Sequence, residues 1–198
     1  IIWGGGLFLA FGSQKCSTSP DGITWTVRTG FNTAFSGSDP YAATWNGSIY
    51  VVVGQSGKCA TSSDGISWTA RASFTTAFGS TNNAKSIAWD GSKFVAVGDN
   101  AVNTKCVTST NGTSWTAPSS NISTLLSSVG SVIFDGTKFL LVGGTAVGSG
   151  CCWSLDGITW SVVSSFTTAF SPGGALAIAK GSTILVAVGT LGTAAAYN

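Results

Sequence analysis

Seven aspartates, five cysteines and two arginines are the residues with most chemical potential in this chain of 198 residues. Glu, His and Met are absent, so acid–base catalysis would depend on Asp alone, and metal binding on Asp and Cys. A glycosidase or lyase built on Asp needs two carboxylates roughly 5 to 9.5 Å apart. Repeated turns account for five of the seven, leaving Asp39 and Asp99. We therefore predict no catalytic set, no metal site and no cofactor.

The richest polar cluster follows the apolar run at 94–98. It contains Asp99, Asn100, Asn103 and Lys105, in a loop that differs from its counterparts after Gly12, Gly54 and Gly143. These side chains suit hydrogen bonding to a sugar or a protein surface better than catalysis. We expect a ligand site here, if the chain has one on this face.

A second group of polar residues recurs along the chain. Asp or Asn stands at positions 21, 64, 111 and 156, spaced by 43, 47 and 45 residues. Ser precedes each by two residues, Gly follows directly, and Trp comes four residues later. Asp and Asn accept backbone hydrogen bonds in turns, and Gly allows positive φ. We therefore predict structural turns, each covered by its Trp, at Asp21/Trp25, Asp64/Trp68, Asn111/Trp115 and Asp156/Trp160.

These turns need strands to position them. Each unit also holds a second hairpin, such as WDGSKFVAVG at 89–98, so a full unit reads as four short strands, the last spanning ISWTARASF at 66–74. TTAF or NTAF then serves as a loop to the next unit, and no helical periodicity is visible. Four antiparallel strands per roughly 45 residues indicate an all-β propeller. We predict one domain, 1–198, with five blades in a ring, at 1–35, 36–78, 79–124, 125–170 and an incomplete 171–198.

The turns resemble the Asp-box, or BNR, repeat of sialidases and related propellers, Ser-x-Asp-x-Gly-x-x-Trp. Here Gly22, Gly65, Gly112 and Gly157 follow the Asp or Asn directly, one residue shorter than that motif. The resemblance implies a propeller whose repeated turn is structural. Sialidase chemistry would need an arginine cluster and a Glu, whereas this chain has only Arg28 and Arg71 and no Glu. It therefore does not imply the sialidase reaction.

The phrases NNAKSIAWDGSKFVAVG at 82–98 and TSSDGISWT at 61–69 also resemble uncharacterised repeat proteins of large DNA viruses, phages and bacteria. This resemblance implies an origin rather than an activity.

Composition excludes several partners. A net charge of +2, with 8% charged residues, argues against a nucleic-acid surface. Every apolar run is interrupted before the roughly 20 residues that a membrane helix requires, so we expect no membrane insertion. Asn46, Asn111 and Asn121 lie in glycosylation sequons. Four cysteines recur five residues before the turn Asp or Asn, as expected of a duplicated buried position.

Three functions remain open. The first is a noncatalytic propeller for attachment or assembly on a virion or extracellular surface, with protein subunits or surface glycans as partners. The second is a carbohydrate-binding lectin, and the third is the Asp-dependent glycosidase or lyase. The last unit lacks a fourth strand, so we also expect an unpaired strand edge through which the chain could form oligomers.

Overall fold

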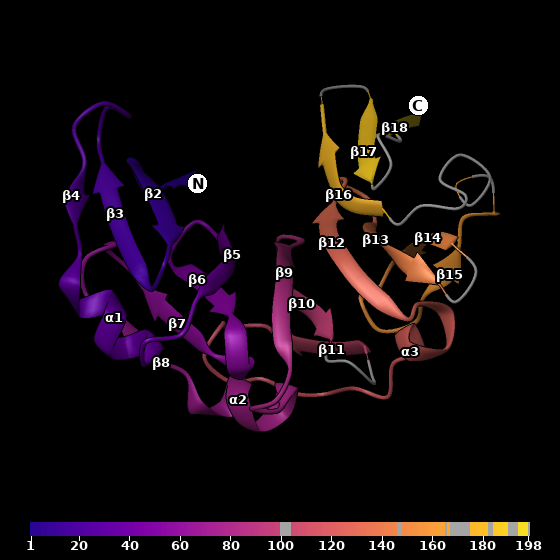
Figure 1. The fold of residues 1–198 in the computed structure, drawn as a ribbon, viewed down its shortest axis with the longest axis horizontal. Coiled ribbons are helices and arrows are strands. Elements are labelled where there is room, and N and C mark those ends of the chain that lie inside the picture. The colour runs from indigo at the N-terminus through magenta and orange to yellow at the C-terminus, as the bar shows by residue number, and fades with distance from the viewer. Residues whose placement is uncertain are drawn as a thin grey trace.

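The structure, a computed structural model, describes residues 1–99, 104–145, 148–164, 166, 175–181, 184–189 and 194–197. Its strands form five antiparallel sheets, one for each repeat, which we number as blades 1 to 5. The blades stand side by side along an arc, with β5, β9, β12 and β16 on its inner side (Figure 1). The predicted architecture of repeated antiparallel blades is confirmed.

Each blade follows the chain order of its strands. Blade 1 contains β1 (Ile2–Gly4), β2 (Leu7–Gly12), β3 (Lys15–Ser19) and β4 (Thr26–Val27), and blade 2 contains β5 (Pro40–Trp45), β6 (Tyr50–Gly54), β7 (Cys59–Ser62) and β8 (Thr69–Ala70). Blade 3 contains β9 (Asn83–Trp89), β10 (Phe94–Asp99) and β11 (Thr104–Ser109), with a single further bridge between Thr108 and Thr116. Blade 4 contains β12 (Ser128–Phe134), β13 (Phe139–Thr145), β14 (Gly148–Ser154) and β15 (Ser161–Val162), and blade 5 contains β16 (Ala175–Lys180), β17 (Leu185–Gly189) and β18 (Ala194–Tyr197).

The first hairpin of blades 2, 3 and 4 closes through the side chain of Asn46, Asp90 or Asp135. In each, Oδ1 accepts hydrogen bonds from the backbone N–H groups two and three residues further on, at 2.7 to 2.9 Å. The glycine that follows has a φ of about +100°. The Asn-Gly and Asp-Gly pairs therefore form the turns that the sequence predicts.

A β-bulge interrupts the inner strand of four blades. One residue in each of β5, β9, β12 and β16 has no partner in the ladder, and these residues are Tyr41, Lys85, Gly130 and Leu176. The bulge brings a backbone carbonyl against the glycine near the end of the second strand. A Cβ on Gly54, Gly98 or Gly143 would clash with the carbonyl oxygen of Asp39, Asn83 or Ser128. The repeated glycine is thus required by the bulge opposite it.

The core lies between the blades. Side chains on the second strand alternate, so that two face the following blade and two face the preceding one. Val51 and Val53 of β6, for example, pack in one cluster with Phe94 and Ala96 of β10. All four are fully buried. Each blade therefore depends on its neighbours for the burial of its apolar side chains.

The segment after the fourth strand differs from the prediction. The expected long strand over 66–74 shortens to β8, and the expected TTAF loop is the end of helix α2 (Ala72–Phe78). Helix α1 (Thr29–Phe35) replaces the NTAF loop, and α3 (Ile122–Leu125) follows blade 3. Phe74 and Phe78 lie four residues apart on one helix face and stack at 5.2 Å between ring centroids. Burial of that pair selects a helix despite the surrounding Thr and Ser.

The five blades do not close into the expected ring. Blades 1 and 5 stand at the two ends of the arc and are well separated (Figure 1). Five blades at this spacing complete only part of a circle. Among the described residues, the sheet of blade 5 ends at β18, and no helix is long and apolar enough to span a membrane.

Candidate functional site

The four repeated turns share one hydrogen-bond pattern. In blade 2, Ser62 Oγ donates to Asp64 Oδ1 at 2.9 Å, and the same oxygen accepts from the N–H groups of Ile66 and Ser67 at 2.8 and 2.7 Å. The N–H of Gly65 donates to Ser62 Oγ. The turns at Asp21, Asn111 and Asp156 repeat these bonds. In each turn, Oδ1 of the Asp or Asn is therefore occupied by backbone N–H groups.

These hydrogen bonds lower the pKa of the turn aspartates. The backbone N–H of Ser67 is the largest influence on Asp64 and lowers the pKa of its carboxyl to about 2. The N–H of Thr24 does the same for Asp21, whose pKa is also about 2. Both groups are therefore anionic at neutral pH, which suits hydrogen-bond acceptors and not proton donors.

The turn tryptophans of blades 2, 3 and 4 pack against the preceding blade. Trp68 lies edge-on to Phe31 of α1, in blade 1, with ring centroids 5.1 Å apart. Trp115 meets Phe74 of α2, in blade 2, in the same way. Trp68 and Trp115 each also donate Nε1–H to the backbone oxygen of their own turn glycine. The turn residues thus join neighbouring blades, which is a structural role.

Asp99, the anchor of the predicted ligand cluster, is buried. Its carboxylate pairs with Lys85 Nζ at 2.8 Å and accepts a hydrogen bond from Val129 N–H at 2.7 Å. Asp99 therefore links β10 to β9 of the same blade and to β12 of blade 4. Lys105 is half-buried on β11, and Asn100 and Asn103 lie outside the described residues. The carboxylate expected to pair with Asp39 in an acidic enzyme is thus already engaged, and a ligand site made by these four residues stays a prediction.

Two of the sequon asparagines hold turns, and the third joins blades. Asn46 and Asn111 accept backbone N–H groups through Oδ1. Asn121 Oδ1 accepts from Trp160 N–H at 2.8 Å, while its Nδ2 donates to Trp160 O at 2.9 Å. Nδ2, the atom that a glycan would modify, thus already uses one of its two hydrogens in the contact between blades.

All five cysteines are free and buried. Burial raises the pKa of the Cys16 thiol to about 12, so it is protonated at neutral pH and unreactive. Within the ranges that the structure describes, no three His, Cys, Asp or Glu side chains gather in a way that could hold a metal ion.

A different surface emerges on the inner side of the arc. The four bulges occupy equivalent positions, and their side chains differ completely: Tyr41, Lys85, Gly130 and Leu176. A bulge re-aims a side chain away from the regular ladder. Tyr41 is about half exposed, at 48%. The bulges therefore present variable side chains on an otherwise repeated scaffold.

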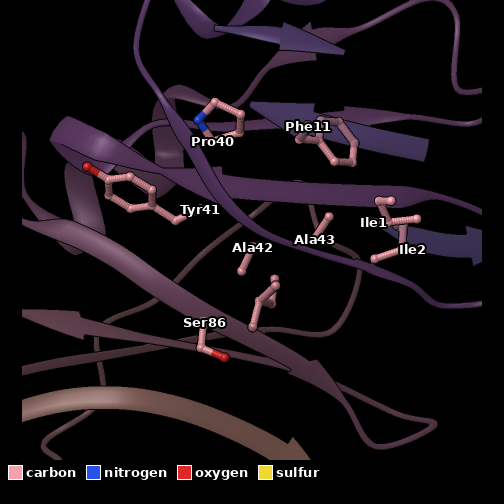
Figure 2. Close-up of a pocket in the computed structure, with 9 residues that line it drawn as sticks. Ile1, Ile2, Phe11, Pro40, Tyr41, Ala42, Ala43 and Ser86 are labelled. Atoms are coloured by element: carbon pink, nitrogen blue, oxygen red, sulfur yellow. The ribbon is translucent and has the colours of Figure 1, made fainter. Parts of the chain in front are cut away.

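A groove of about 260 Å³ lies beside Tyr41 (Figure 2). Its lining comes from blades 1, 2 and 3: Ile1, Ile2, Phe11, Pro40, Tyr41, Ala42, Ala43, Ser86 and Ile87. Most of these residues have apolar side chains, but the surface that they expose to the groove is more polar than apolar. Tyr41 lies at one end, and Phe11 and Ile2 lie toward the other. Ser86 Oγ already accepts a hydrogen bond from Val132 N–H at 3.0 Å. The groove therefore offers both polar and apolar contacts, with the phenol of Tyr41 at one end.

Sequence reasoning missed this groove. Its residues belong to three separate repeats and occur as ordinary strand residues. The one available signal is the divergence at the bulge position, between repeats that are otherwise alike. The bulge position can be recognised only when the strand register shows which residue has no partner in the ladder.

The chain belongs to the DUF6242 β-propeller domain family, whose model matches residues 9–195. A search of curated protein sequences gives no match. The match supports the β-propeller reading of the repeats. The narrower Asp-box and sialidase assignment stays a prediction.

Solved structures share the fold at low sequence identity. YCF48 bound to D1 peptide is 15% identical with a TM-score of 0.68, over 99% of this chain and 62% of that one. A chain of the Nidogen/Laminin complex is 11% identical with a TM-score of 0.62, over 92% of this chain and 85% of that one. An ancestral GH74 enzyme is 14% identical with a TM-score of 0.59, over 90% of this chain and 28% of that one. The chain therefore spans about three fifths of the YCF48 chain that it resembles, and the similar folds include an enzyme and proteins in complexes.

Proposed function

We propose that this propeller is a noncatalytic binding protein that holds a segment of a protein partner on its inner surface, in an assembly or attachment role. The observation that carries the proposal is the groove beside Tyr41, lined by residues of three blades. Pockets that bind ligands combine apolar walls with a few polar groups that fix orientation. Here Ile, Phe, Pro and Ala residues line the groove, polar atoms make up more than half of the surface exposed to it, and the phenol of Tyr41 lies at one end.

Tyr41 suits recognition of another protein. Tyrosine is enriched at binding hot spots because it contributes a large rigid area at little conformational cost. Its place in a bulge frees it from the ladder and exposes it beside the groove. The neighbouring bulge carries Lys85, whose charge is directed to Asp99. The exposed recognition element is therefore aromatic rather than ionic.

The aspartates support a role without catalysis. Those in the repeated turns accept backbone hydrogen bonds, and Asp99 is bonded to Lys85 and Val129. YCF48, a similar fold, is seen bound to a peptide, and protein binding is what we extend to this chain. A virion or extracellular surface is the setting we propose, since Ser, Thr and Asn provide most of the surface polarity in place of charges.

The test is selection of peptides from a random displayed library, followed by affinity measurement on purified chain. We expect a set of peptides related in sequence to be enriched, and Tyr41→Ala to weaken their binding about tenfold or more. Tyr41→Phe separates loss of the hydroxyl from loss of the ring. Ile66→Ala is the matched control, because Ile66 is equally exposed, at 45%, but lies on a turn between strands.

Two results would contradict the proposal. One is peptide binding that Tyr41→Ala leaves unchanged while Ile66→Ala lowers it. The other is binding on a glycan array, with no selected peptide, which would favour the lectin alternative.

A further inference from the structure

Main-chain groups contribute to the groove beside Tyr41. Among its lining residues only Tyr41 and Ser86 carry a side-chain oxygen, yet the surface exposed to the groove is more polar than apolar. Backbone N–H and C=O groups must therefore supply part of that polarity. Ile87 of β9 lines the groove, and the strand register shows where its backbone groups point.

The N–H and C=O of Ile87 point away from β10. At the turn that closes the β9–β10 hairpin, the N–H of Asp90 donates to Lys93 O, and hydrogen-bonded and non-hydrogen-bonded pairs alternate from there. The pair of Ile87 and Ala96 lies three positions along and is therefore non-hydrogen-bonded. Within the described part of the chain, neither backbone group of Ile87 has a hydrogen-bond partner.

The next junction shows how an equivalent pair of groups is satisfied. Val132 occupies the position of Ile87 in β12 of blade 4. Ser86 Oγ accepts a hydrogen bond from Val132 N–H at 3.0 Å and donates one to Val132 O at 3.3 Å. One group that both donates and accepts thus satisfies both backbone atoms.

Blade 2 offers no such group to Ile87. In β5 the residue directly after the bulge is Ala42, where β9 has Ser86. Ala42 packs against the cluster that contains Ile87, but its methyl group can neither donate nor accept. Blades 2 and 3 each have a neighbour on both sides (Figure 1), so these open groups do not depend on the ends of the chain.

We infer that the partner segment binds in an extended conformation and pairs its main chain with Ile87. One residue of an extended strand offers its C=O to the N–H of Ile87 and its N–H to the C=O of Ile87, as in the hydrogen-bonded pairs of an antiparallel sheet. This inference rests on the proposed function, and it adds that the backbone of the segment is what the groove recognises, beside the contact with Tyr41.

The first test fills the open groups. Ala42→Ser supplies the hydroxyl that Ser86 supplies at the next junction, so it should raise the melting temperature and weaken a library-selected peptide about fivefold or more. Ala42→Cys is the matched control, because a thiol is close in size to a hydroxyl and is a weak hydrogen-bond partner. Ser86→Ala, which opens the corresponding groups of Val132, should lower the melting temperature.

The second test alters the peptide. Each peptide bond of the selected peptide is replaced in turn by an ester, which removes one N–H and keeps every side chain. One ester position should weaken binding to the unaltered chain about fivefold or more, and the same ester should cost less with Ala42→Ser, where the C=O of Ile87 is already occupied.

Three outcomes would overturn the inference. Equal weakening by Ala42→Cys and Ala42→Ser would mean that size alone explains the loss. Peptides that depend on Tyr41 but bind Ala42→Ser unchanged, with no sensitive ester position, would refute main-chain pairing and leave the proposed function standing. Failure to select any peptide would refute both.

Discussion

The ring of Trp115 stands edge-on to the ring of Phe74, with centroids 4.9 Å apart and an angle of 84° between planes. Trp115 comes from the turn of blade 3, and Phe74 comes from α2, which follows blade 2. Both are buried. This contact explains why the turn, the tryptophan and the Phe-containing helix recur together, since each is needed for a blade to pack on its predecessor.

Trp115→Ala should therefore destabilise the protein strongly. Loss of a buried Trp side chain costs about 3 to 5 kcal/mol of unfolding free energy. Trp25→Ala is the matched control, because Trp25 has the same turn and no preceding blade in the described chain. We expect it to cost under about 1 kcal/mol. Urea denaturation of both variants measures the difference, and equal losses would show that the tryptophans stabilise their own hairpins rather than the junctions.

Gly98→Ala should also be destabilising, because its Cβ would clash with the carbonyl of Asn83 at the bulge. Overpacking of this kind costs about 1 to 3 kcal/mol. Gly12 occupies the same strand position in blade 1 and has no atom within 4 Å of its Cβ site. Gly12→Ala should change the melting temperature little. A tolerated Gly98→Ala would mean that the bulge does not require glycine.

The turn aspartates should contribute to acid sensitivity. The folded-state pKa of Asp64 is about 2, below its ordinary 3.8. Its contribution to stability is therefore present above about pH 4 and is lost as the pH falls toward 2. Asp64→Asn should be nearly neutral at pH 7, because Asn111 makes the same bonds in blade 3. Its unfolding free energy should fall less than that of the unaltered chain between pH 5 and pH 2.

Asp64→Ala distinguishes the hydrogen bonds from the charge. It removes the acceptor of Ile66 and Ser67 N–H, so a loss of about 1 kcal/mol is expected at pH 7. If Asp64→Asn and Asp64→Ala were equally unstable at neutral pH, the charge and not the hydrogen bonding would hold the turn.

Asp99→Ala should lower stability by about 2 kcal/mol, since it leaves Val129 N–H and Lys85 without their acceptor. Lys85→Met should cost less, because the bond from Val129 remains. Thermal unfolding of the two variants ranks these contributions. The reverse order would indicate that the ion pair, rather than the link to blade 4, is the main contribution.

The sequence predicts the parts of this fold that are encoded locally. Asp-Gly and Asn-Gly pairs determine turn positions through backbone chemistry, and short apolar runs such as 94–97, bounded by turn residues, determine strands. Helix α2 was not predictable in this way, because only Phe74 and Phe78 of its seven residues are large and apolar, and their burial depends on Trp115 of the next repeat. The arc likewise depends on the packing between blades, which no single repeat specifies.

The candidate site was harder to predict for a related reason. Asp99 looked available because polar residues follow it, yet its partners, Lys85 and Val129, are distant in sequence. Tyr41 looked like an ordinary strand residue, because a bulge is visible only in the pairing of two strands. When strand register and packing between blades bring the residues of a site together, the site cannot be recognised from the types of those residues alone.

The most direct measurement is the hydrogen-exchange footprint of a bound, library-selected peptide on the unaltered chain. If the groove holds the peptide, added protection should appear along β5 and β9, around Tyr41 and Ile87, with the turns at Asp21, Asp64, Asn111 and Asp156 unchanged. Protection confined to those turns, with β5 and β9 exchanging as in the free protein, would contradict it.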